Sequence, residues 1–266
     1  MRKFLLAAAA TLAIQTPVHA LIGIGVSGGL NNTSIDAKTE SVTGADLPSY
    51  FGTANAPRLD LQREKMSGMY QLGVKAWLEL PLLPIEFEAA SNLAWGNYRS
   101  SLTYSDGING TKQIPVDVPS PLVGFGEDKG STPYVNLLTD LTIRYPLIEI
   151  PPVLHTLKLY VGAGVTHVLA TRVIDKKDIQ ETFESVASGV KFDPSNQAGL
   201  ESASKVVEDE LMQSTIGGHV SVGAQLKVPV LPFAFFVDGK WYFNTATSDA
   251  ATKYPLVVSG GVGFAL

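Results

Sequence analysis

The stretch from Thr215 to Thr245, TIGGHVSVGAQLKVPVLPFAFFVDGKWYFNT, determines the fold that the sequence predicts. Apolar residues occupy every second position up to the segment PVLP at 229–232, and alternation resumes after it with large aromatic residues. A period of two places successive side chains on opposite faces of a β-strand. Proline lacks a backbone donor, so the two prolines mark a turn where strand pairing stops. The stretch therefore predicts a β-hairpin with strands long enough to cross a membrane.

The first 20 residues have the composition of a secretory signal peptide. Arg2 and Lys3 form a basic start, an apolar core runs over 4–14, and Val18-His19-Ala20 resembles an A-x-A cleavage site. The apolar run is too short to span a bilayer as a helix. We therefore favour cleavage after Ala20 over a membrane anchor, which leaves residues 21–266 as the mature protein.

Composition narrows the possible functions. The chain has no cysteine, which excludes a disulfide framework and a cysteine nucleophile. Without Arg2 and Lys3 the mature chain carries 18 basic and 25 acidic residues, a net charge of −7. This balance argues against a nucleic-acid partner, because nucleic acid favours basic surfaces. No apolar run of about 18 residues follows the signal, so we expect no transmembrane helix.

Eight segments show period-two alternation, each near the roughly 9 to 11 residues that a tilted membrane strand needs. Short, mostly proline-rich connections alternate with long polar ones, which places all the long loops at one end of the predicted structure. An even strand count lets the first strand pair with the last and removes the sheet edges. The predicted strands cover residues 21–30, 69–80, 85–98, 134–145, 157–171, 215–228, 233–245 and 254–266.

These segments predict an all-β fold, an eight-stranded antiparallel transmembrane β-barrel with extracellular loops at about 31–68, 99–133, 172–214 and 246–253. A cleaved signal, eight alternating strands and the ending Gly263-Phe264-Ala265-Leu266 resemble small outer-membrane barrels of the OmpA/OmpX type. The resemblance implies a place in the bacterial outer membrane, with membrane lipids and the barrel-insertion machinery as partners. It also implies an insertion signal at Phe264 and Leu266, although family members usually end in the aromatic residue itself.

Strict alternation assigns the charged strand residues to the inner face. An eight-stranded barrel is just wide enough to be filled by its own side chains, and an unpaired buried charge is costly. We therefore predict a plugged lumen held by salt bridges, with an ion pathway as the alternative. The predicted charge network has five acids and five bases: Lys75, Glu79, Glu86, Glu88, Asp140, Arg144, Lys158, Lys227, Asp238 and Lys240.

The third predicted loop differs from the others because parts of it have helical spacing. Asp178 and Glu181 fit a capping box, and apolar residues follow at helical intervals up to Gly189 and again over 196–212. We predict a helical hairpin within residues 172–214. It is either a surface for an extracellular partner or a lid that shields the lumen.

No motif for catalysis, a cofactor or a metal is present in the sequence. His219 and Ser221 share the inner face of one strand, but two strand steps separate them by about 6.6 Å, beyond hydrogen-bond reach. His167 is predicted to face outward, where a lipid hydrolase would need it, without an identifiable serine and acid. The sequence thus favours a non-enzymatic outer-membrane barrel with a structural or loop-mediated role. A narrow solute channel and, less favoured, a lipid-modifying enzyme are the alternatives.

Overall fold

The structure, a computed structural model, describes residues 21–43, 58–80, 83–105, 111–115, 131–150, 157–177, 212–228 and 231–265. Eleven strands occur in these ranges. They are β1 (Leu21–Ile35), β2 (Lys38–Thr43), β3 (Arg58–Arg63), β4 (Met66–Glu79), β5 (Glu86–Ser105), β6 (Thr111–Pro115), β7 (Ser131–Ile150), β8 (Leu157–Thr171), β9 (Met212–Lys227), β10 (Phe233–Phe243) and β11 (Leu256–Ala265).

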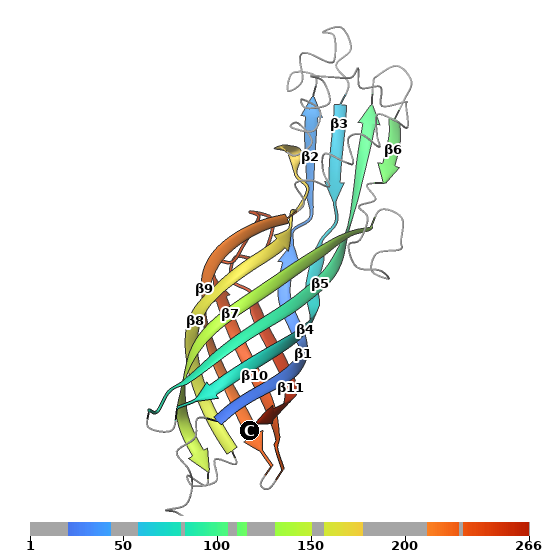
Figure 1. The fold of residues 1–266 in the computed structure, drawn as a ribbon. Helices are drawn as coiled ribbons and strands as arrows, with labels where there is room; N and C mark the ends of the chain where they lie inside the picture. Colours follow the sequence, from blue (N-terminus) through green and yellow to red (C-terminus); the bar gives the residue numbers. More distant parts are fainter. Residues whose placement is uncertain are drawn as a thin grey trace, which may run out of the picture.

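Eight of the strands close into an antiparallel barrel, as predicted (Figure 1). The order around the barrel is β1-β4-β5-β7-β8-β9-β10-β11, and pairing of β1 with β11 completes the ring. The first residues of β1, β5 and β10 and the last residues of β4, β9 and β11 lie at one end, which we call the terminal end (Figure 1). At the predicted hairpin turn Leu231 N–H donates to the Val228 carbonyl at 3.1 Å. We call the opposite end distal.

The barrel strands are staggered and tilted. One oblique row of laterally paired residues starts on β10 at Phe233 and returns to the same strand at Phe243, which gives a shear of 243 − 233 = 10 residues. Closure of eight strands with such a shear requires a strand tilt of about 40°. The row passes in order through Phe264, Ile24, Ala76, Ala89, Leu141, Val165 and Gly218.

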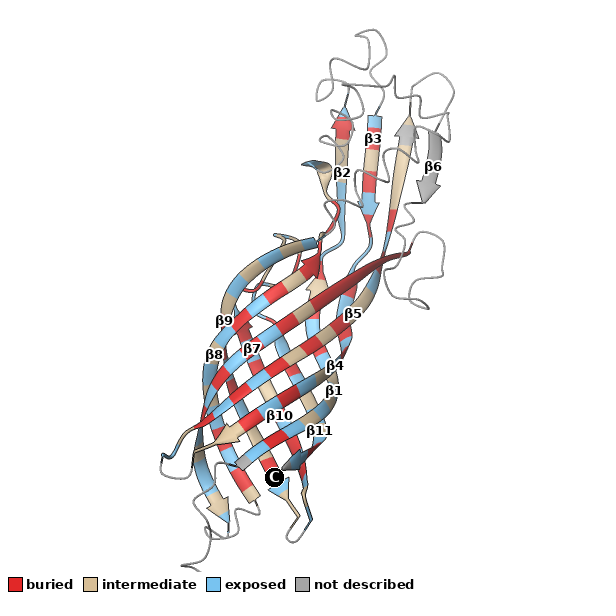
Figure 2. Cartoon of the chain, in the orientation of Figure 1, coloured by how far each residue is buried: buried red, intermediate tan, exposed pale blue. Residues whose placement is uncertain are grey.

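Buried and exposed residues alternate along the barrel strands (Figure 2). The exposed face is apolar: Ile24, Leu141 and Val222 are 59–62% exposed. Aliphatic side chains exposed to this extent around a closed barrel face lipid. Exposed aromatic residues gather near both ends, as at the two interfaces of a membrane. Tyr70, Trp241, Phe243 and Tyr254 lie toward the distal end and Tyr145, Phe233 and Phe264 toward the terminal end, whereas Trp95 is half-buried.

A second sheet, which we call the distal sheet, stands beyond the barrel (Figure 1). Its strand order is β2-β3-β5-β6, and β5 runs through both sheets. Where β1 and β4 leave the barrel, the register shifts and Gly68 adopts φ = 77°. A positive φ is readily accessible to glycine. The long β5 links the distal sheet to the barrel wall, because it pairs with β3 and β6 in the one and with β4 and β7 in the other.

The distal sheet corrects two predicted loops. The described parts of 31–68 contain the end of β1, β2, β3 and the start of β4, and those of 99–133 contain the end of β5, β6 and the start of β7. The sequence signal was weak because β2, β3 and β6 are only five or six residues long and carry few apolar residues. Thr39, Ser41 and Thr43 alternate along β2 with only Val42 as an apolar neighbour. Threonine and valine still favour strands, and cross-strand pairing completes the sheet.

The third predicted loop is only partly described. Its last residues, from Met212, belong to β9, and a short helical turn occurs at 176–177. The predicted helical hairpin otherwise falls on 178–211, outside the described residues, as do the signal peptide and Leu266. In the described ranges no helix is long and apolar enough to cross a membrane.

Candidate functional site: the barrel interior

The ten predicted charged residues all project into the barrel and lie mainly in its terminal half. They come from β4, β5, β7, β8, β9 and β10. Eight are buried, and Glu79 and Lys227, near the terminal end, are 15% and 16% exposed in their side chains. We call this set, together with its hydrogen-bond partners, the charged layer.

The other two strands, β1 and β11, line the interior with glycine. A Cβ atom at Gly23 would collide with the indole of Trp77, and one at Gly25 would approach the ring of Phe236 to 2.9 Å. Trp77 and Phe236 pack edge to face at 6.3 Å between ring centroids. Small residues on β1 and β11 thus make room for aromatic side chains from the neighbouring strands β4 and β10.

The ion pairs form one continuous chain that begins at the terminal end. Lys227 Nζ lies 2.7 Å from Glu79, and Glu79 lies 3.2 Å from Lys158. Lys158 also pairs with Glu86, which lies 3.0 Å from Arg144. Five charged residues near the terminal end are therefore linked by direct ion pairs: Lys227, Glu79, Lys158, Glu86 and Arg144.

The chain continues through Glu88, where it branches. Glu88 lies 3.1 Å from Arg144, 3.4 Å from Lys75 and 2.9 Å from Lys240. Lys75 reaches Asp238 at 2.5 Å and Lys240 reaches Asp140 at 2.8 Å. Every one of the ten charges thus has an opposite charge within 4.0 Å, as burial of charge requires.

Neutral side chains complete the charged layer. Tyr242 Oη donates to Asp140 at 2.9 Å, Thr166 Oγ1 donates to the same carboxylate at 2.8 Å, and Tyr160 donates to Asp238. The Arg144 guanidinium also lies over the Tyr160 ring, 4.5 Å from its centroid. Inner-face parity could have found these residues, because they alternate with outward apolar ones.

Glu149 was not predicted as part of the network. It lies 3.7 Å from Lys158 and is 25% exposed in its side chain. The prolines at 146 and 151–152 indicated that the strand ends at Tyr145 and that a connection to the next strand follows. In the structure β7 continues through Pro146 with a register shift and ends at Ile150, so Glu149 belongs to the strand.

His219 lies fully buried beside Asp140. Its Nδ1 is 2.8 Å from Thr166 Oγ1 and its Nε2 is 2.9 Å from Thr142 Oγ1. Because the Thr166 proton goes to Asp140, Thr166 must accept from Nδ1–H, and Thr142 then donates to Nε2. This pattern fits a neutral imidazole with a structural role. Both ring nitrogens bond to threonine hydroxyls rather than to the neighbouring Ser221.

The distal half of the interior has a different composition. A cluster of buried, mainly apolar residues fills it between the charged layer and the distal sheet, and we call it the apolar layer. Tyr242 belongs to it and joins the two layers through its bond to Asp140. The apolar layer consists of Ile35, Met66, Met69, Ala94, Tyr98, Tyr134, Leu138, Val168, Ala170, Val173, Tyr242 and Val257.

The described residues of the charged layer leave little free space between them. An enclosed cavity inside the charged layer, beside Lys75, Glu88 and Gln71, measures about 10 Å³. That is the room of about one water molecule. Among the described residues no group of three or more His, Asp or Glu side chains is placed to hold a metal ion. The arrangement is a buried network of ion pairs that joins six of the eight barrel strands.

Two further predicted positions lie on the outer surface. Phe264 is 39% exposed near the end of β11 and packs edge to face on Phe233, at 6.1 Å between ring centroids. Its role as an insertion signal stays a prediction. His167 is exposed on β8, opposite Thr139 on β7 and Ile216 on β9.

A closed eight-stranded barrel with an apolar outer face has the fold of a small bacterial outer-membrane protein. Solved structures of this kind are similar to the chain. Neisserial surface protein A (NspA) has 10% identity and a TM-score of 0.43, over 92% of this chain and 98% of that one. Ail, the attachment invasion locus protein of Yersinia pestis, solved with the heparin analogue sucrose octasulfate, has 9% identity and a TM-score of 0.37, over 92% and 99%. These similarities concern the fold alone. No protein-family model and no curated protein matches the chain.

Proposed function

We propose that the chain is a non-enzymatic integral protein of the bacterial outer membrane that presents its distal segments to an extracellular partner. Residues 1–20 would be removed as the signal peptide, and the distal end would face outside the cell. The observation that carries the proposal is the filled interior. A continuous ion-pair chain and an apolar layer occupy the lumen, so the barrel serves as a support rather than as a passage.

The distal sheet supports the presenting role because it fixes the segment that leads out of β8. Arg63, only 5% exposed, donates from its guanidinium to the Ile174 carbonyl at 2.8 Å and to the Asp36 carbonyl at 3.1 Å. The Lys176 N–H donates to Glu40 on β2 at 3.0 Å. The chain therefore enters residues 178–211 from a fixed point on the distal sheet, which suits a segment that meets a partner.

Conductance separates this function from a channel. The purified mature protein, reconstituted in planar bilayers, should give no steady open-channel current at neutral pH. A reproducible single-channel current would overturn the plugged barrel and support the narrow channel.

Segment replacement tests the presenting role. Replacing residues 178–211 by a short Gly/Ser linker should abolish binding of the bacteria to host-cell surfaces or extracellular matrix. The same replacement of residues 116–130 serves as the matched control and should leave binding intact. Heat-modifiable gel mobility verifies that both variants still form the barrel. Unchanged binding after loss of 178–211 would contradict the role assigned to that segment.

A further inference from the structure

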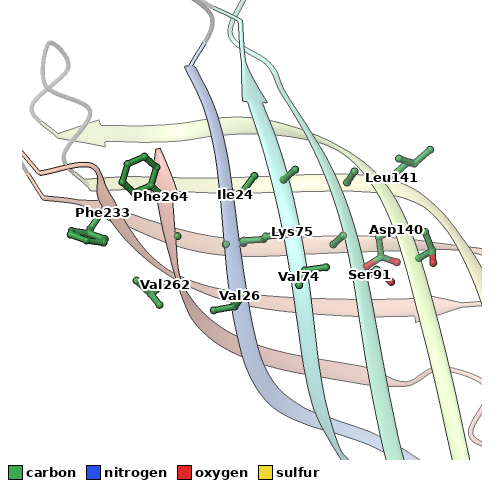
Figure 3. A pocket seen from close by; sticks show the side chains of 16 residues that line it. Ile24, Val26, Val74, Lys75, Ser91, Asp140, Leu141, Phe233, Val262 and Phe264 are labelled. Atoms are coloured by element: carbon green, nitrogen blue, oxygen red, sulfur yellow. The ribbon is translucent and has the colours of Figure 1, made fainter. Parts of the chain in front are cut away.

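A hollow lies on the lipid-facing surface of the barrel, across β11, β1, β4, β5 and β7 (Figure 3). It measures about 680 Å³ and borders a second hollow of about 590 Å³ that shares Ala76, Ala89 and Leu141 with it. The cause is a local change of side-chain size. Ala76 and Ala89 are cross-strand partners, whereas the flanking positions carry Ile24, Val74 and Leu141. Two adjacent alanines thus leave a depression between larger side chains.

Polar side chains reach the same hollow from one side. Ser91 on β5 and Thr139 on β7 line it and are cross-strand partners. His167 on β8 follows Thr139 in the same lateral row. Thr139 and His167 are exposed on a face that is mainly apolar around them. Polar groups in the hydrocarbon region are costly unless they find a hydrogen-bond partner, so this row requires an explanation.

The shear of the barrel places the His167 end of this oblique row near the distal interface. With strands about 4.8 Å apart and tilted by about 40°, a lateral row rises about 3 Å along the barrel axis per strand. The row that contains His167 begins at Phe235 and passes through Val262, Val26, Val74, Ser91 and Thr139. His167 is six strands beyond Phe235 in this row, which places it about 18 Å higher along the barrel axis. Phe235 lies about 5 Å above Phe233, because it is two residues further along β10. His167 therefore lies about 23 Å above Phe233. An apolar band is about 25 Å tall.

We propose that the hollow is a binding site for one lipid of the outer leaflet. An acyl chain lies along Ala76 and Ala89 toward Ile24 and the terminal end. Thr139 and Ser91 donate hydrogen bonds to an ester or hydroxyl oxygen near the start of the chain. His167 meets the headgroup at the distal interface. The proposal is independent of the presenting role, because the hollow faces the membrane and contains no distal segment.

A second copy of the barrel fits the hollow less well. A two-fold interface brings the same patch of both copies together, so a dimer centred here would place one depression against another. Two facing hollows cannot fill each other, and packed interfaces leave few voids. A flexible chain can enter a depression that a convex barrel wall cannot fill.

Native mass spectrometry of the full mature barrel tests the proposal. The protein in detergent is titrated with lipid A, the lipid of the outer leaflet, and should retain one molecule of it in a saturable way. Ala89→Leu fills the hollow and should weaken retention at least about tenfold, the effect of about 1.4 kcal/mol. Thr139→Val and His167→Ala each remove a hydrogen-bonding group and should weaken it about fivefold.

Ala224→Leu is the matched control. Ala224 also faces outward, on β9, but lies outside both hollows. This variant should bind lipid as the parent does, and heat-modifiable mobility verifies that all variants fold. Equal retention in Ala89→Leu and Ala224→Leu would overturn the proposal. A lipid-free dimer that only Ala89→Leu disrupts would also overturn it and identify the hollow as a protein interface.

Discussion

The two halves of the barrel interior are closed by different physical means. The terminal half holds ten charged side chains joined in one network, whereas the distal half is filled by the apolar layer around Leu138, Val168 and Tyr98. Both halves are enclosed by the same eight strands. The comparison shows that a barrel of this width can be filled by either solution, and that the two solutions should respond differently to mutation.

The difference lies in what remains after one side chain is removed. For a complete buried ion pair, the attraction between the charges roughly offsets the cost of removing them from water. Loss of one partner leaves the other charge with neither water nor a counter-ion. In the apolar layer the loss is the transfer free energy of the removed atoms and the cost of the cavity left behind. The charged layer should therefore be more sensitive to single substitutions than the apolar layer.

Removal of Arg144 should give the largest effect. Arg144 is 1% exposed and pairs with both Glu86 and Glu88. Arg144→Leu leaves these two carboxylates with reduced compensation and should lower the free energy of unfolding by about 3–5 kcal/mol. Urea-induced unfolding of the barrel in lipid vesicles measures the change.

The control for Arg144 is an ion pair outside the barrel. Arg58 on β3 pairs with Asp60 at 2.7 Å, but its side chain is 58% exposed. Arg58→Leu should change the free energy of unfolding by less than about 1 kcal/mol, the usual range for exposed pairs. Similar losses from both variants would mean that burial does not set the importance of the interior network.

Truncation in the apolar layer should cost somewhat less. Leu138 is fully buried, whereas Leu141, three residues on, is 59% exposed on the lipid-facing side. Leu138→Ala should lower the free energy of unfolding by about 2–5 kcal/mol. Leu141→Ala should cost about 1 kcal/mol or less, because lipid chains are as apolar as the leucine that they replace. The same unfolding measurement compares them, and a larger loss at Leu141 would reverse the assignment of faces.

The charged layer could be predicted from the sequence, whereas the apolar layer could not. Charged residues such as Lys75 and Asp140 stand out on a strand face, so parity alone was enough to place them inside. The apolar layer was missed because Leu138 and Val168 are apolar residues that face inward beside the exposed polar residues Thr139 and His167, which reverses the pattern of the rest of the barrel. Only the closed barrel shows which face is inner there. The distal sheet was missed for another reason, since β2, β3 and β6 are only five or six residues long and carry few apolar residues.

Glycine substitutions compare the rigidity of the two halves. Gly23 faces the indole of Trp77, whereas Gly96, in the distal half, faces the thioether of Met66, whose sulfur would lie 2.8 Å from an added Cβ atom. Gly23→Ala should destabilise by about 1–3 kcal/mol, because the packed indole cannot move aside. Gly96→Ala should cost about 1 kcal/mol or less, since methionine is flexible and can change rotamer. Equal unfolding midpoints for the two variants would show that both halves yield to the same extent.

The smallest effect concerns the distal sheet, whose ion pair between Arg58 and Asp60 lies on its exposed face. Although desolvation raises the pKa of Asp60, hydrogen bonds from Ser41 and Arg58 and the charge of Arg58 outweigh it and hold this pKa below the ordinary 3.8. A carboxylate with a lowered pKa stabilises the folded state above its unfolded pKa, and that stabilisation is lost as the pH falls through the folded value.

The distal sheet should therefore open more readily below about pH 4, with a change under about 1 kcal/mol because the pair is partly exposed. Hydrogen exchange over residues 58–63, corrected for the intrinsic rate at each pH, measures the opening. Asp60→Asn should abolish this local pH dependence and leave exchange over 157–171 in the barrel unchanged. If the parent and Asp60→Asn respond to acid in the same way, the Arg58–Asp60 contact does not hold the sheet, and its stability must come from its buried face around Leu59 and Leu61.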